Sequence, residues 1–201
     1  MHELILLSLV AFFAAITPGP DSILVLRSTL IFGTKQGFQV LFGIATGWLL
    51  YFALIYAGLS YILNIPFIQL FLSFIGGLYL LYLAYNLLIL PPSNNEIEFH
   101  NAQKDGYLRG LIVNLSNPKA IIFFIFLLTP FLTFQHGIFW SFIVLWCSLF
   151  IAFCFIIMIG SIARKYICAK YFYYIDKICG GLFGIFAWWL LFEAGKTIGM
   201  I

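Results

Sequence analysis

Charged residues are scarce in this chain, and one long stretch contains none. Asp, Glu, Lys and Arg make up 8% of the 201 residues, whereas hydrophobic residues make up 64%. None of the four charged types occurs between Gln36 and Asn95, a run of 60 residues. This composition excludes a soluble domain, and the uncharged run is long enough for two membrane spans of about 20 residues each. The sequence therefore predicts an all-α integral membrane protein, with the lipid bilayer as its surroundings.

Motifs for chemistry on a bound substrate are also missing. The chain has no Gly-x-x-x-x-Gly-Lys-Ser/Thr loop for nucleotide phosphates, no His-Glu-x-x-His zinc helix and no Gly-x-Ser-x-Gly nucleophile turn. Its net charge of +3 is too small for a nucleic-acid surface. We therefore expect a carrier and not an enzyme, with no cofactor and no nucleic-acid partner.

Cysteine is absent from the first half of the chain. The four cysteines are Cys147, Cys154, Cys168 and Cys179, and no two are spaced as Cys-x-x-Cys. A membrane thiol-electron carrier built from two similar halves needs a reactive cysteine in each half, so this alternative is disfavoured. A divalent-metal exporter needs clustered Asp, His or thiolate ligands within the spans. It stays open as an alternative, as does a scaffolding membrane protein.

The apolar runs predict six transmembrane helices. Their approximate ranges are 4–32, 38–63, 67–90, 107–133, 138–163 and 173–195. As one straight helix the first would measure about 43 Å, against a hydrocarbon core of about 30 Å. A kink or an interruption is therefore expected within it. The polar link 91–106 separates two groups of three helices.

Two proline motifs are placed to break the first and fourth helices. They consist of Thr17, Pro18, Gly19, Pro20 and Asp21 in the first and Asn117, Pro118 and Lys119 in the fourth. Proline removes a backbone donor, and in lipid the freed carbonyls need partners in protein or in a water-filled cavity. Broken helices at matching places in two halves are typical of a transport site.

The two halves resemble each other in further positions. Pro18 and Pro118 are 100 residues apart, as are Gly37 and Gly137, and the Gly-Gly-Leu that begins at Gly76 recurs at Gly180. Because each half has three helices, the second copy enters the membrane from the opposite side. We predict one transporter domain, 1–201, made of two inverted repeats: repeat A 1–90, the linker 91–106 and repeat B 107–201.

Basic residues near the membrane predict the orientation. Lys35 follows the first helix, Lys104 and Arg109 flank the entry to the fourth, and Arg164, Lys165 and Lys170 lie between the fifth and the sixth. Links rich in Lys and Arg stay in the cytoplasm, so these three are predicted to be cytoplasmic. Both termini are then extracytoplasmic.

Two charged residues fall beside the predicted breaks. Asp21 and Lys119 would each cost on the order of 3 kcal/mol at the bilayer centre unless paired or hydrated. In one interpretation they form a structural ion pair, or Lys119 reaches the interface and Asp21 caps the restarting helix. In the other, Asp21 binds a cationic group of a substrate, while Lys119 and a helix N-terminus bind an anionic one. An amino acid carries both groups.

Polar and small residues nearby also admit two interpretations. Asn114 and Asn117 are either ligand contacts or interhelical hydrogen bonds, and Thr17 is expected to satisfy carbonyls freed by the prolines. Gly43 and Gly47, with Gly180, Gly181 and Gly184, are expected to let helices pack closely. Such faces are also compatible with a homodimer.

At these residues the sequence resembles the LysE/RhtB family of bacterial amino-acid exporters. The resemblance rests on the motif 17–21, on Gly37, Gly43 and Gly47, on the stretch 76–83 (Gly-Gly-Leu-Tyr-Leu-Leu-Tyr-Leu) and on 110–120, which contains Asn-Pro-Lys. It implies a secondary transporter in the bacterial inner membrane that exports amino acids or related small metabolites, driven by the proton gradient. Many members have Asn where this chain has Asp21, and this chain has Pro130-Phe131 where many have Pro-Gln-Phe. The extra carboxylate either favours a cationic group of the substrate or carries the coupling proton.

Overall fold

The computed structural model describes residues 2–57, 65–89, 105–117, 119–121, 123–124, 137–166 and 171–198. Within these ranges the regular structure is helical and contains no strand. The helices are α1 (His2–Ile16), α2 (Pro20–Phe32), α3 (Thr34–Tyr56), α5 (Pro66–Ile89), α7 (Tyr107–Leu115), α9 (Gly137–Arg164) and α10 (Phe172–Ile198). The prediction of an all-α chain is confirmed for this part of the sequence.

Among the described residues, two helices are long and apolar enough to span a membrane, and a bent pair of helices forms a third candidate span. The two helices are α3 and α9, and the pair is α1 with α2, with a bend of 61° at the break between them. The predicted interruption of the first helix is therefore present. The predicted fourth helix is described only as far as residue 124, and positions 91–104 of the linker lie outside the described residues.

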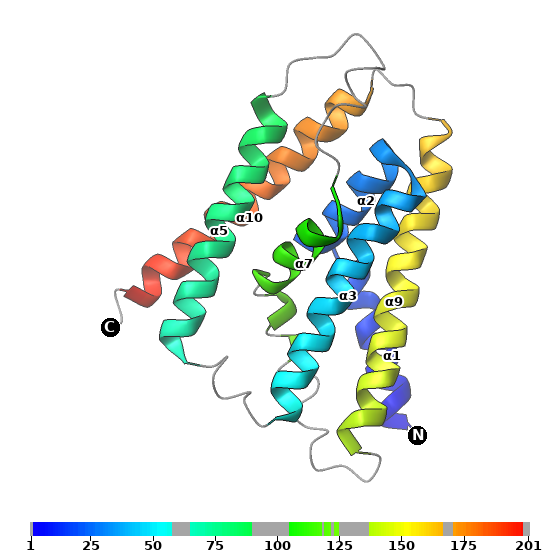
Figure 1. Cartoon of the computed structure of the whole chain (residues 1–201), viewed down its shortest axis with the longest axis vertical. Coiled ribbons are helices and arrows are strands. Elements are labelled where there is room, and N and C mark those ends of the chain that lie inside the picture. Colours follow the sequence, from blue (N-terminus) through cyan, green and yellow to red (C-terminus); the bar gives the residue numbers. More distant parts are fainter. Residues whose placement is uncertain are drawn as a thin grey trace.

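The helices form two groups (Figure 1). α5 and α10 lie side by side along one edge of the molecule and pack mainly against each other. In the other group, α3 packs on α7, and α1 and α2 pack on α9. Helices far apart in the sequence are therefore the closest neighbours. α2 also contacts α7, which places residues near 20 next to residues near 115.

Glycines permit the closest of these approaches. A methyl group on Gly43 would overlap the carbonyl of Tyr107, and one on Gly110 would overlap the carbonyl of Val40, so α3 and α7 touch through their backbones. Gly47 similarly leaves room for a side chain of α7. The prediction that Gly43 and Gly47 let helices pack closely is confirmed.

The equivalent prediction for α10 holds for one glycine of three. Gly180 packs against Ala84, Leu87 and Leu88 of α5, but a methyl group on Gly181 would meet no described atom within 4 Å. A methyl group on Gly184 would make only an ordinary contact with Ala84 at 3.9 Å. Of these three glycines, Gly180 lies on the side of α10 that packs tightly against α5. The sequence does not show which glycine lies on that side.

A glycine pair provides a test of this packing. We expect Gly43→Ala to lower the apparent melting temperature in detergent by roughly 2–12 °C, since overpacking costs about 1–3 kcal/mol and 1 kcal/mol corresponds to about 2–4 °C at this length. Gly181→Ala should leave it unchanged, because the added methyl group meets open space. Size-exclusion chromatography after a heating series measures both, and equal melting temperatures would contradict the close α3–α7 contact.

Candidate functional site

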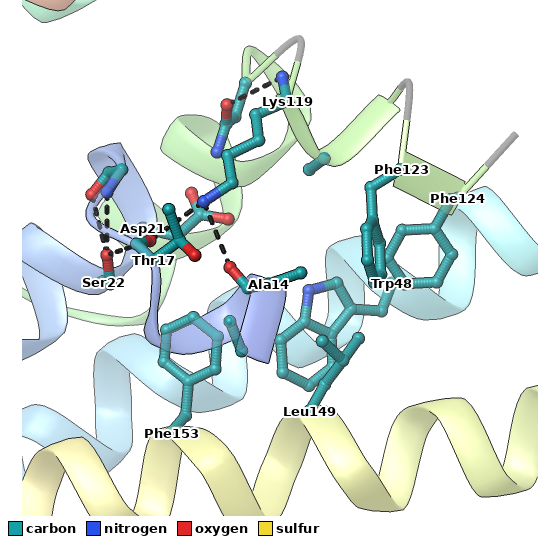
Figure 2. Close-up of a pocket in the computed structure, with 14 residues that line it drawn as sticks. Ala14, Thr17, Asp21, Ser22, Trp48, Lys119, Phe123, Phe124, Leu149 and Phe153 are labelled. Carbon is teal, nitrogen blue, oxygen red and sulfur yellow. Dashed lines mark hydrogen bonds between the residues drawn. The ribbon is translucent and has the colours of Figure 1, made fainter. Parts of the chain in front are cut away.

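The break in the first span leaves a carbonyl without its helical donor. Pro18 has no N–H for the carbonyl of Ala14, which lies four residues earlier. The Lys119 ammonium donates to this carbonyl at 3.1 Å and to that of Thr17 at 2.9 Å (Figure 2). A cation here also complements the negative end of the α1 dipole. Lys119 thus stabilises the broken end of α1 from a segment more than 100 residues away.

The second half of the broken span begins with a well-formed N-terminus. Pro20 occupies the first helical turn, where its missing N–H is not needed, and Gly19 is the capping residue. The Gly19 N–H donates to the Ser22 hydroxyl at 2.9 Å. Asp21 lies in the first turn, where a carboxylate is favoured by the helix dipole. It does not itself provide the cap, contrary to one of the two interpretations above.

The fourth span breaks in a similar way. α7 ends at Leu115, and Asn117 caps the segment that follows by accepting the Lys119 N–H on its side-chain oxygen at 3.1 Å. Pro118 lies outside the described residues, but as a proline it has no N–H for the carbonyl of Asn114. The Tyr51 hydroxyl donates to that carbonyl at 2.9 Å. This carbonyl also accepts the Asn117 N–H at 3.0 Å. Of the two carbonyls that lose a helical donor to a proline, that of Ala14 is therefore the one held by a distant side chain, whereas that of Asn114 keeps a backbone donor as well.

The role predicted for Thr17 is wrong. Its hydroxyl donates to the carbonyl of Phe13 at 2.9 Å, and this carbonyl already accepts the Thr17 N–H at 3.0 Å. The carbonyl that lacks a donor because of Pro18 is that of Ala14, and Lys119 donates to it. A lysine is able to do this because its long side chain crosses between two segments, which a threonine hydroxyl cannot do.

Asp21 and Asn114 form the buried centre of the site. The Asn114 side-chain amide donates to one Asp21 carboxylate oxygen at 2.6 Å, and Asn117 lies beside the same carboxyl group. The other Asp21 oxygen and the Asn114 side-chain oxygen are buried without a hydrogen-bond partner among the described residues. A buried acceptor without a donor is costly, so a group that brings N–H donors would be bound favourably here.

Asp21 and Lys119, both described, do not form an ion pair, so that interpretation is wrong as well. The ion pairs found in the described part of the chain join other residues, and the Lys119 ammonium is held by backbone carbonyls. Both side chains nevertheless border one pocket. The charges are therefore near each other without neutralising each other.

The pocket has a polar and an apolar side (Figure 2). The space between its atoms amounts to about 420 Å³, a value that includes open solvent. Asp21, Thr17 and Lys119 lie on one side, and Trp48, Phe123 and Phe124 on the other. The described residues that line it are Ala14, Ala15, Thr17, Gly19, Asp21, Ser22, Trp48, Asn117, Lys119, Ala120, Phe123, Phe124, Leu149 and Phe153. Of the predicted site residues, the pocket brings together Thr17, Gly19, Asp21, Asn117 and Lys119. Pro20 and Asn114 are buried behind it.

Four charged residues outside the pocket form contacts that were not predicted from the sequence. Arg27 of α2 donates to Asp176 of α10 at 2.8 Å and to Asp105, which also accepts from Arg109. Arg27 and Asp105 are almost fully buried, at 2% and 0% exposure. Opposite charges inside the first and sixth predicted spans were the available signal, because a lone charge in a span needs a partner.

No group of three or more His, Cys, Asp or Glu side chains that would suit a metal ion occurs among the described residues. The chemistry at the pocket is instead that of a carboxylate, an amide and an ammonium group surrounded by aromatic rings. Groups of these kinds are able to form charge contacts and hydrogen bonds with a small zwitterion.

The fold and the site define a helical membrane protein with a small-molecule pocket between two broken helices. The chain belongs to the LysE type translocator family, whose profile matches residues 12–194. It is similar to the leucine efflux proteins of Salmonella choleraesuis and Salmonella typhimurium, each 30% identical over 171 residues and 80% of both chains. A leucine efflux protein of Enterobacter sp. is 27% identical over 184 residues, which cover 87% of this chain and 86% of the relative. No solved structure matches the chain.

Proposed function

We propose that this protein is a secondary transporter that exports amino acids with bulky apolar side chains across the bacterial inner membrane. The observation that carries this proposal is the two-sided pocket, in which Asp21 and Lys119 face a wall of aromatic rings. Curated relatives named leucine efflux proteins point to the same class of substrate. Neither a metal exporter nor a thiol-electron carrier fits this combination.

The geometry suggests one orientation of the substrate. Its ammonium group supplies donors to the unpartnered Asp21 oxygen. Two of the three Lys119 N–H groups point at carbonyls, and the third is left for the substrate carboxylate. The side chain then lies against Trp48 and Phe124, where removing it from water is favourable by about 25 cal/mol per Å² of apolar surface.

We also propose six spans arranged as two inverted repeats. A two-fold relation between the halves would exchange the first span with the fourth and the second with the fifth. The observed packing of α3 on α7 and of α1 and α2 on α9 is a pair of contacts of this kind, and α5 with α10 would be the pair on the axis. The proposal includes extracytoplasmic termini and coupling to the proton gradient.

An efflux assay tests the function. Bacteria that express the chain and are fed leucine- and alanine-containing dipeptides should release leucine well above cells with an empty vector. The variant Ala120→Leu, which fills part of the apolar side, should lower leucine release about tenfold more than alanine release, since one methylene in an apolar pocket is worth about 1–3 kcal/mol. Release of neither amino acid, from protein shown to be in the membrane, would overturn the proposal.

A further inference from the structure

The charged residues whose contacts were not predicted from the sequence form one buried cluster, which we call the Arg27 cluster. It consists of Arg27, Ser28, Asp105, Arg109 and Asp176. Besides the contacts given above, the Ser28 hydroxyl donates to Asp105 at 2.7 Å. Two arginines oppose two aspartates, so the cluster carries no formal net charge.

The Arg27 cluster lies at one end of the molecule, away from the pocket. Arg27 is six residues beyond Asp21 on α2, or about 9 Å along the helix. Asp105 precedes Asn114 by nine residues, so α7 runs antiparallel to α2 and carries the cluster to the same end. Lys35 begins α3 and Arg164 ends α9 at this end, where the Arg164 guanidinium lies beside Gly33. We call it the basic end.

The cluster also joins the two groups of helices. Asp176 belongs to α10, and Tyr79 of α5 lies against Arg109 of α7. Among the described residues, the α5–α10 pair also meets the other helices where α10 packs on α2 and where Gly76 of α5 lies against Ser116, just after α7. Separation of α10 from α2 at the basic end would therefore require the Arg27–Asp176 ion pair to break.

The energetics of buried charges suit a contact that opens repeatedly. The attraction within a buried ion pair is largely offset by the cost of removing its charges from water, so the net stabilisation is small. When the contact opens, water enters and rehydrates both charges. If the contact were apolar instead, opening it would cost about 25 cal/mol of free energy for each Å² of apolar surface exposed to water, and no rehydration of charges would offset this cost.

We propose that the Arg27 cluster is the gate that closes the pocket from the basic end, and that it opens by separating the α5–α10 pair from α2 and α7. This inference rests on the proposed transport function. It assigns the charges a role other than substrate binding. In the structure described here the cluster is closed.

Labelling from each side of the membrane tests the gate without reference to any substrate. The four cysteines are replaced by serine, and Ala14→Cys, which lines the pocket, serves as the reporter. A membrane-impermeant thiol reagent is applied to vesicles of either orientation. The balanced change Arg27→Gln with Asp176→Asn leaves the Asp105–Arg109 ion pair intact. We expect it to raise labelling from the basic end at least about fivefold, as a shift in the population of open molecules. An unchanged rate would overturn the gate.

A reversible bridge covers the case in which the balanced variant does not fold. Arg27→Cys with Asp176→Cys, joined by a short cleavable bis-thiol reagent, should stop leucine exchange until the reagent is cleaved. Leu87→Cys with Gly180→Cys is the matched control, since it joins α5 to α10 within the pair that should move as one unit. Full exchange with the 27–176 bridge in place would show that the cluster need not open. No exchange by the parent chain, with labelling that still responds to the cluster, would instead overturn the transport proposal alone.

Discussion

Lys119→Ala is expected to reduce leucine efflux about 100-fold. The substitution leaves the carbonyls of Ala14 and Thr17 without the ammonium donor and, under the proposed function, removes the positive charge that would meet the substrate carboxylate. Losing a hydrogen bond to a charged group costs about 1.5–3 kcal/mol, which corresponds to about 10–100-fold, and the unsatisfied carbonyls add to this cost. Efflux from cells with equal amounts of membrane-inserted protein measures the effect.

Two further variants separate charge from structure at this position. Lys119→Arg keeps a cation with several donors and should retain part of the efflux. Lys35→Ala removes an exposed lysine at the start of α3 and should leave efflux unchanged. If Lys119→Ala exports as well as the parent chain, Lys119 has no part in the site, and the break in α1 tolerates unpaired carbonyls.

Asp21→Asn is expected to reduce both net efflux and leucine exchange about 100-fold. The amide has nearly the shape of the carboxylate and still accepts from Asn114, so the change removes mainly the charge that the substrate ammonium would meet. The loss of a charged contact in a dry site should appear in every mode of transport that requires bound leucine. Proteoliposomes measure exchange with leucine on both sides, and they measure net transport when a pH gradient is imposed.

The two modes also distinguish the alternatives left open for this carboxylate. If Asp21→Asn keeps leucine exchange but no longer responds to the pH gradient, Asp21 carries the coupling proton and the substrate ammonium binds elsewhere. Exchange at the rate of the parent chain together with an intact response would exclude both roles. Asn114→Ala is a useful companion, because it removes the amide donor to Asp21 and leaves the charge in place.

Much of this architecture could be predicted from patterns along the chain. The uncharged runs predict apolar helices, and a proline removes its own N–H wherever it occurs, so the break in the first span was expected at its observed place. The close approach at Gly43 and Gly47 was also predictable, since only small residues permit such contacts. Each of these inferences depends on local chemistry.

The partners of the charged groups could not be predicted in this way. Lys119 was expected to pair with Asp21, to reach the membrane interface or to face a substrate, and the contact of its ammonium with the carbonyls at the end of α1 was not foreseen. The contact of the Tyr51 hydroxyl with the second break could not be predicted, since tyrosine is common in this chain and nothing marks this one. Long side chains can reach several positions, and the choice among them depends on which helices lie next to each other.

The sequence by itself determined the membrane character of this protein, its helices, the place of the break in its first span and its family, because hydrophobicity and missing backbone donors act within a few residues. Only the tertiary structure decided that α5 pairs with α10, that Lys119 donates to the carbonyls at the end of α1 and that Arg27 forms ion pairs with Asp105 and Asp176. These contacts link residues up to 149 positions apart. They arise from helix packing, and no local pattern specifies which distant helix will supply the partner.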